Sequence, residues 1–171
     1  AFDRIAIDKD VDGVTAFGFG RMSLGIQAYP ACTPAGIVKL LDHYKINLSG
    51  LHAVIVGRSP ILGKPMAQLL LNRDCTITVC HSRTKDLPRH LQSADLVVAA
   101  CGKPRYIVGD WIKEGAIVVD AGYNDGNIGD ADFESCAKKA SWITPVPGGV
   151  GPMTITTLIA HTVESAEKAS G

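Results

Sequence analysis

The sequence predicts an α/β fold, in which a doubly wound sheet of parallel strands carries helices on both faces. Short apolar runs rich in β-branched residues alternate with stretches of helical periodicity, and glycines follow several of the runs. Such alternation is typical of a Rossmann-like domain, whose parallel strands are joined by crossover helices. The expected strands are Leu51–Gly57, Thr76–Cys80, Ala94–Cys101, Gly115–Gly122 and Ser141–Thr144, and helices are expected around Thr84–Gln92, Gly109–Lys113 and Asp132–Ala140.

The turn after the first expected strand has the character of a phosphate-binding turn. Its glycines are spaced G-x-S-x-x-x-G, and a helical pattern begins directly after them. Gly57 suits the tight turn, Ser59 offers a hydroxyl to a phosphate, and Gly63 allows close packing of helix on strand. The alternative is an ordinary strand-to-helix turn, since such turns often contain glycine.

The second expected strand indicates which dinucleotide would bind. A fold that prefers NAD usually places an acid near the end of this strand, yet no Asp or Glu stands between Cys75 and Lys85. Ser82, Arg83 and Thr84 stand there instead, and Arg58 is available from the first turn. Cations and hydroxyls suit a 2′-phosphate, so NADP is favoured. Alternatively, Arg83 and Lys85 are solvated surface charges.

A loop rich in glycine and proline precedes the last helical pattern. The segment Pro145–Thr154 reads PVPGGVGPMT, a stiff loop with exposed backbone amides. Thr154 is the expected N-cap of the following helix. A shaped loop at a helix start can hold an anion or a flat ring, although a plain tight connection is the alternative. The expected apolar face of that helix comprises Ile155, Leu158, Ile159, Thr162, Val163 and Ala166.

Three more segments lie at the expected ligand-binding edge or at a helix start. Gly102-Lys103-Pro104 and Gly122-Tyr123-Asn124 each follow a strand, where parallel sheets bind their ligands. Another helix is expected to begin at Thr33-Pro34, with Thr33 as its N-cap.

Composition excludes several classes of function. The 171 residues, 46% of them hydrophobic, are enough for one main core. Seventeen acids balance seventeen bases, so nothing suggests nucleic acid as a partner. No apolar run is long enough to cross a membrane, and no secretory signal is visible. Five cysteines without a C-x-x-C pair favour buried free thiols in a reducing cytoplasm and no metal site.

A series of short motifs closely resembles one enzyme family along nearly the whole chain. The family is that of bifunctional methylenetetrahydrofolate dehydrogenase/methenyltetrahydrofolate cyclohydrolases. The resemblance implies oxidation of 5,10-methylenetetrahydrofolate by NADP and hydrolysis of the product to 10-formyltetrahydrofolate, by a cytoplasmic homodimer joined through its cofactor domains. The motifs are Lys9-Asp10-Val11-Asp12-Gly13, Cys32-Thr33-Pro34, Gly57-Arg58-Ser59, Gly63-Lys64-Pro65-Met66, Cys80-His81-Ser82, Gly102-Lys103-Pro104 and PVPGGVGPMT.

The resemblance also implies roles for individual residues. Gly57, Arg58 and Ser59 fall on the cofactor phosphates, and Ser82 with Arg58 falls at the 2′-phosphate. Asp12 falls on the aspartate that binds the pterin. The cofactor set is completed by Arg83, Gly102, Tyr123 and the loop Pro147, Gly148, Gly149, Val150, Gly151, Pro152, Met153, Thr154 and Ile155, of which Pro147 through Gly151 are also expected to line the folate site.

One departure from the family pattern concerns catalysis. Family members carry a first domain ahead of the KDVDG motif, and its Tyr-x-x-x-Lys pair supplies the catalytic lysine. No tyrosine here is followed by a lysine at that spacing. We therefore expect the carboxyl-terminal part of a longer protein, with 1–32 a remnant of the folate domain and 33–171 the NADP-binding domain. The chain alone is expected to be inactive; alternatives are a non-catalytic NADP-binding or assembly module and a different dinucleotide-dependent dehydrogenase.

Overall fold

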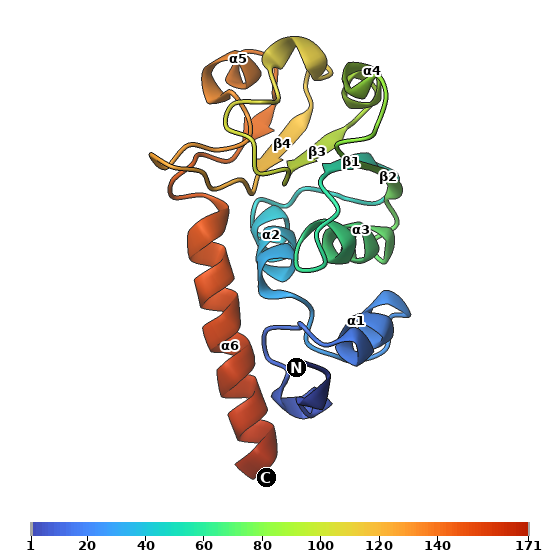
Figure 1. Ribbon diagram of the computed structural model, residues 1–171, viewed down its shortest axis with the longest axis vertical. Helices are drawn as coiled ribbons and strands as arrows, with labels where there is room; N and C mark the ends of the chain where they lie inside the picture. Colours follow the sequence, from blue (N-terminus) through green and yellow to red (C-terminus); the bar gives the residue numbers. More distant parts are fainter. Residues whose placement is uncertain (1, 171) are drawn as a thin grey trace.

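The computed structural model describes residues 2–170, and a five-stranded parallel sheet lies at its centre. The strands follow the order β2-β1-β3-β4-β5 (Figure 1). Strand β2 is added on one side of β1 and the later strands on the other, so the strand order reverses between β1 and β3. This confirms the doubly wound α/β fold. The strands are β1 (His52–Val56), β2 (Thr76–Cys80), β3 (Leu96–Ala99), β4 (Ile117–Asp120) and β5 (Trp142–Ile143).

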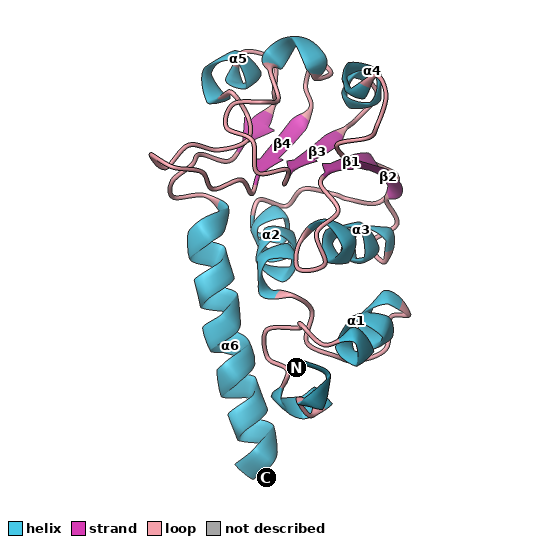
Figure 2. Cartoon of the chain, in the orientation of Figure 1, coloured by secondary structure: helices cyan, strands magenta, loops and turns pink. Residues whose placement is uncertain are grey.

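Helices cover both faces of this sheet, as the sequence predicted. In Figures 1 and 2, α2 and α3 lie on one face while α4 and α5 lie on the other. The helices are α1 (Ala16–Ser23), α2 (Cys32–His43), α3 (Gly63–Leu71), α4 (Leu87–Gln92), α5 (Phe133–Ala137) and α6 (Val150–Ser170), and three 3₁₀ turns are Phe2–Arg4, Ile7–Lys9 and Gly109–Trp111.

Successive side chains of the central strands point to opposite faces of the sheet and so contribute to two separate hydrophobic cores. Ile55 of β1 packs with Met66 of α3 on one face, while Val54, its neighbour in the strand, packs with Leu91 of α4 on the other. All four side chains are fully buried. Because both faces are covered, the strands are apolar at consecutive positions, which is why they appear in the sequence as continuous apolar runs.

Helix α6 leaves the sheet and runs along α2 toward the first residues of the chain (Figure 1). Its buried positions beyond the first turn are polar: Thr157, His161 and Ser165. Ser165 donates a hydrogen bond of 2.7 Å to the carbonyl oxygen of Asp8, and His161 Nδ1 lies 2.9 Å from the carbonyl oxygen of Val11. These contacts fix the far half of α6 against residues near the start of the chain.

The apolar face predicted for this last helix exists, but it is largely exposed. Ile155, Ile159 and Val163 are between 51% and 64% exposed, and Leu158 is 38% exposed. The helix packs on α2 through its small and polar side instead.

Several element boundaries differ from the sequence-based expectation. The last helix begins at Val150, so Thr154 is not its N-cap; Pro152 fits inside the first turn, where a backbone N–H has no helical partner. The helix α2 begins at Cys32 with Ala31 as its N-cap, so Thr33 is not the cap either. The segment expected around Gly109–Lys113 is a 3₁₀ turn, and the other expected strands and helices, except Thr76–Cys80, are shorter at one or both ends.

Candidate functional site

The turn after β1 brings three chain segments unusually close together. Gly57 has a φ of +137°, and a Cβ atom there would lie 2.0 Å from the carbonyl oxygen of Ala100, beyond the end of β3. A Cβ atom at Gly63 would lie 2.2 Å from the carbonyl oxygen of Gly57. Only glycine fits either position, so the amino end of α3 sits directly against the turn, as the glycine spacing predicted.

Ser59 joins this turn to the first residues of α3. Its Oγ accepts a hydrogen bond of 3.3 Å from the backbone N–H of Gly63, and its carbonyl oxygen accepts one of 3.0 Å from Lys64. The hydroxyl proton of Ser59 is thereby left to donate to a ligand. The geometry agrees with a phosphate-binding turn at a helix amino end.

A cavity of about 290 Å³ opens where the strand order reverses, and we call it the nucleotide cavity. Parallel sheets bind their ligands at this kind of reversal. It contains cations and hydroxyls but no carboxylate. Its lining residues are Val56, Gly57, Arg58, Ser59, His81, Ser82, Thr84, Leu87, Ala100, Cys101, Lys103 and Tyr106.

Lys103 and Tyr106 line this cavity although neither was among the predicted cofactor-binding residues. Lys103 places its ammonium 4.6 Å from the centroid of the Tyr106 ring, and Tyr106 packs edge-on against Trp111 at 5.5 Å. Together they add a cationic and aromatic part to the wall of the cavity that Arg58 also lines. The only sequence signal was the position of Lys103 just past a strand; nothing in the pattern pointed to Tyr106.

A second cavity, of about 630 Å³, lies along the glycine-proline loop, and we call it the loop cavity. Gly148 has a φ of +95°, and a Cβ atom at Gly149 would lie 2.4 Å from the carbonyl oxygen of Pro145. The peptide bond between Val146 and Pro147 is cis. The lining residues are Thr33, Asp120, Ala121, Gly122, Tyr123, Asn127, Pro145, Val146, Pro147, Gly148, Gly149, Val150, Gly151, Pro152, Thr154 and Ile155.

Four predicted site residues are not in the walls of these cavities. Arg83 is exposed, and its backbone N–H donates to His81 Nδ1. Gly102 lies between two residues of the nucleotide cavity and has a φ of +66°. Met153 lies against Gly36 of α2, where a Cβ atom would come within 3.1 Å of its side chain.

Asp12, the fourth of these, lies beside the amino end of α2. It is exposed, and its carboxylate interacts with the buried thiol of Cys32. Burial, with the hydrogen bond and negative charge of Asp12, raises the pKa of Cys32 to about 12. Cys32 precedes Thr33, which lines the loop cavity, so Asp12 stands near this cavity without forming its wall.

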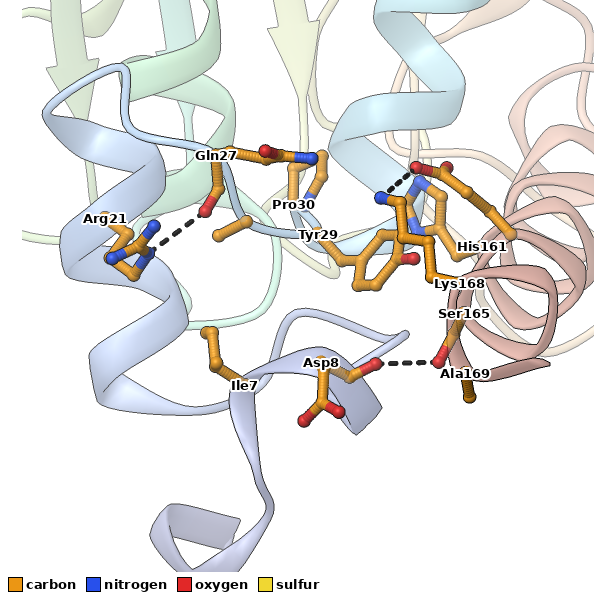
Figure 3. A pocket seen from close by; sticks show the side chains of 12 residues that line it. Ile7, Asp8, Arg21, Gln27, Tyr29, Pro30, His161, Ser165, Lys168 and Ala169 are labelled. Atoms are coloured by element: carbon orange, nitrogen blue, oxygen red, sulfur yellow. Dashed lines mark hydrogen bonds and ion pairs between the residues drawn. The ribbon is translucent and has the colours of Figure 1, made fainter. Parts of the chain in front are cut away.

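A third cavity, of about 400 Å³, lies at the other end of α6 (Figure 3). Its walls come from residues near the start of the chain and from the last turns of the helix. Tyr29 and His161 face each other there with ring centroids 5.0 Å apart, and Lys168 pairs with Glu164 at 2.6 Å. None of its lining residues lines the nucleotide cavity or the loop cavity.

All five cysteines are free thiols, as predicted. Among residues 2–170 no group of three or more His, Cys, Asp or Glu side chains is arranged to hold a metal ion. No helix within that range is both long and apolar enough to span a membrane.

Comparison with known proteins identifies the domain. Residues 31–170 match the family described as "Tetrahydrofolate dehydrogenase/cyclohydrolase, NAD(P)-binding domain". The chain is 61% identical over 168 residues to the bifunctional protein FolD of Shouchella clausii, covering 98% of this chain and 60% of the relative. The chain thus spans about 60% of the length of the curated relatives it matches.

Solved structures agree with this result. The bifunctional FolD enzyme of Campylobacter jejuni superimposes with a TM-score of 0.95 at 49% identity, over 98% of this chain and 61% of that one. The FolD protein of Trypanosoma brucei, solved with NADP cofactor and an inhibitor, superimposes with a TM-score of 0.92 at 34% identity, over 98% of this chain and 61% of that one. The chain therefore belongs to the tetrahydrofolate dehydrogenase/cyclohydrolase family and carries its NAD(P)-binding domain.

Proposed function

We propose that this chain binds NADP, with the adenosine half in the nucleotide cavity and the nicotinamide half along the loop cavity. The composition of the nucleotide cavity carries the proposal. Arg58 and Ser82 line it, and none of its lining residues is an acid. A guanidinium and a hydroxyl favour a 2′-phosphate, whereas a carboxylate would repel it.

The backbone of the first turn supports the same assignment. Gly57 lets the turn lie directly against Ala100 at the end of β3, and the Ser59 hydroxyl can donate its proton to a ligand. The amino end of α3 adds the positive end of a helix dipole next to these groups. Gly57, Arg58 and Ser59 would hold the pyrophosphate, and Ser82, Arg58 and nearby Arg83 would surround the 2′-phosphate.

The loop cavity fits a flat ring and a folate beside it. Tyr123 and the loop Pro147–Ile155 supply the wall, and Gly149 holds the loop against Pro145. The chemistry that NADP supplies when bound is the acceptance of a hydride. The chain's own contribution is to hold the ring in one orientation and to exclude water on one side. Asp12 would bind the pterin of the substrate.

The whole-protein activity requires more than these residues. The relatives are named as bifunctional, and the chain spans about 60% of them. We propose that residues 1–32 belong with the folate domain, that 33–171 form the NADP domain, and that the family's catalytic lysine lies outside this chain. A protein as long as the curated relatives would then be a cytoplasmic homodimer, joined through the cofactor domains. It would oxidise 5,10-methylenetetrahydrofolate and hydrolyse the methenyl product.

The test uses calorimetry and activity assays on the purified 171-residue chain. We expect binding of NADP at least about tenfold tighter than binding of NAD, with no turnover of either folate substrate. Failure to bind NADP would refute the proposal. Turnover at the rate of an intact enzyme would show that a catalytic group lies within these residues.

A further inference from the structure

Asp130 is a fully buried carboxylate between the nucleotide cavity and the loop cavity, and it lines neither of them. Its Oδ2 accepts hydrogen bonds from the backbone N–H groups of Cys101 and Gly102, at 2.6 and 2.8 Å. Its Oδ1 accepts one from the N–H of Lys103 at 2.9 Å and one from Asn124 Nδ2 at 3.0 Å. Both oxygens are therefore committed to the loops that follow β3 and β4.

A second buried carboxylate fixes the backbone that carries Asp130. Asp120 Oδ1 accepts from the N–H groups of Asp130 and Gly122, both at 2.9 Å, and Oδ2 accepts from Ala131 at 2.8 Å. Burial raises the pKa of the Asp120 carboxyl, and these three donors oppose the rise. The segment around Asp130 is thus held at the end of β4.

Two glycines provide the room for these carboxylates. A Cβ atom at Gly122 would lie 2.3 Å from Asp130 Cγ, and one at Gly129 would lie 2.0 Å from Asp120 Oδ2. Any side chain at either position would displace a carboxylate. Close packing against these glycines therefore holds the carboxylates of Asp120 and Asp130 in one position.

The loops held by Asp130 line different cavities. Cys101 and Lys103 belong to the nucleotide cavity, whereas Gly122 and Tyr123, next to Asn124, belong to the loop cavity. We propose that Asp130 is a positioning residue for the dinucleotide, which sets the two loops so that both halves of NADP are held at once. The inference rests on the proposed NADP binding and assigns no contact between Asp130 and the cofactor.

The test compares Asp130→Asn with Asp95→Asn. The amide cannot accept all four hydrogen bonds, because its NH₂ group would face backbone donors. Asp95 is the control: it is half-buried at the amino edge of the sheet, where its Oδ2 accepts from the N–H of His52 at 2.9 Å and its Oδ1 pairs with Lys113. We expect Asp130→Asn to weaken NADP binding at least about tenfold, and Asp95→Asn to change it less than about twofold.

Hydrogen exchange distinguishes a local loosening of residues 101–103 from a general loss of stability, which would also expose the amides of β3. In Asp130→Asn the amides of residues 101–103 are expected to exchange at least about tenfold faster while those of the β3 strand stay protected. An Asp130→Asn variant that is folded and matches Asp95→Asn in NADP affinity would overturn the inference alone. An unsubstituted protein that fails to bind NADP would overturn the proposed function, and this inference with it.

If Asp130→Asn does not fold, Asn124→Ala tests the link between the loops. This variant removes the tie to the segment after β4 and keeps the three backbone bonds of Asp130. We expect NADP binding to weaken about threefold or more, with unchanged affinity for adenosine 2′,5′-bisphosphate, which needs only the nucleotide cavity. Asn72→Ala, which loses a bond to Met22 far from the site, is the control. Equal affinity for NADP in both variants would overturn the inference.

Discussion

The hydroxyl oxygens of Thr33 and Thr154 lie 3.0 Å apart, with Thr154 donating, although 121 positions separate them in the chain. The bond joins the first turn of α2 to the first turn of α6, and both residues line the loop cavity. It thus connects the end of the glycine-proline loop to α2, which begins at Cys32, the residue whose thiol interacts with Asp12.

Replacing Thr154 by valine removes this bond and keeps the side-chain shape. We expect the free energy of unfolding to fall by about 0.5–1.5 kcal/mol, since the bond is partly buried. Urea unfolding of Thr154→Val measures this. Thr156→Val is the control, because the Thr156 hydroxyl is exposed and bonds only within α6; its effect should stay within about 0.5 kcal/mol. Equal losses would mean that the bond between the helices contributes nothing measurable.

Arg58→Ala tests the choice of cofactor. Loss of one charge-assisted hydrogen bond should cost about 1.5–3 kcal/mol, so NADP binding is expected to weaken at least about tenfold while NAD binding barely changes. Calorimetry with both cofactors gives the comparison. Arg73→Ala, which removes an exposed ion pair with Asp42 elsewhere, should leave both affinities unchanged. A similar loss for NADP and NAD would assign Arg58 to the pyrophosphate or to the fold.

Gly149→Val tests the shape of the glycine-proline loop. A side chain here meets the carbonyl oxygen of Pro145, so the loop should shift at a cost of about 1–3 kcal/mol while the sheet still folds. In a full-length relative carrying this domain, both activities should fall together, because one loop lines one site. Gly20→Ala is the control, since a Cβ atom there has nothing within 4 Å. A folded Gly149→Val variant with both activities near wild type would show that the loop only connects two elements and does not shape the site.

The pKa of Cys32 predicts how stability changes in alkaline solution. The thiol has a pKa of about 12 in the folded protein, against an ordinary value of 9.0. The protonated thiol therefore contributes stability that is fully present below pH 9.0 and is lost as the pH rises toward 12. The difference in unfolding free energy between the parent and Cys32→Ala should shrink as the pH rises from about 9 toward 12. A difference that does not change with pH would contradict the prediction.

Local patterns along the chain were sufficient to predict the sheet. Thr76–Cys80 matches β2 at both ends, because the polar residues Asp74 and His81 stand close to its ends and the periodicity changes there. The close packing at Gly57 and Gly63 was also predictable, since a phosphate-binding turn demands glycines there. Helix starts were harder: Thr154 has the chemistry of an N-cap, yet the helix begins four residues earlier because its first turn tolerates proline.

The parts of the site that could not be predicted depend on contacts distant in sequence. Tyr106 reaches the nucleotide cavity through a loop whose path is set by packing on Trp111. Asp130 resembles an ordinary loop acid in the sequence, because nothing local shows that three backbone N–H groups from residues 101–103 converge on it. Likewise, Arg83 follows Ser82 directly but is exposed and does not line the cavity.

The unbroken course of α6 has a mechanical consequence. Val150, in its first turn, lines the loop cavity, while Ser165, several turns later, is bonded to Asp8. A continuous helix of 21 residues is a stiff rod about 30 Å long, with no hinge between those two points. Any tilt imposed on the residues at the start of the chain is therefore transmitted along the rod to the glycine-proline loop, which has to move with it.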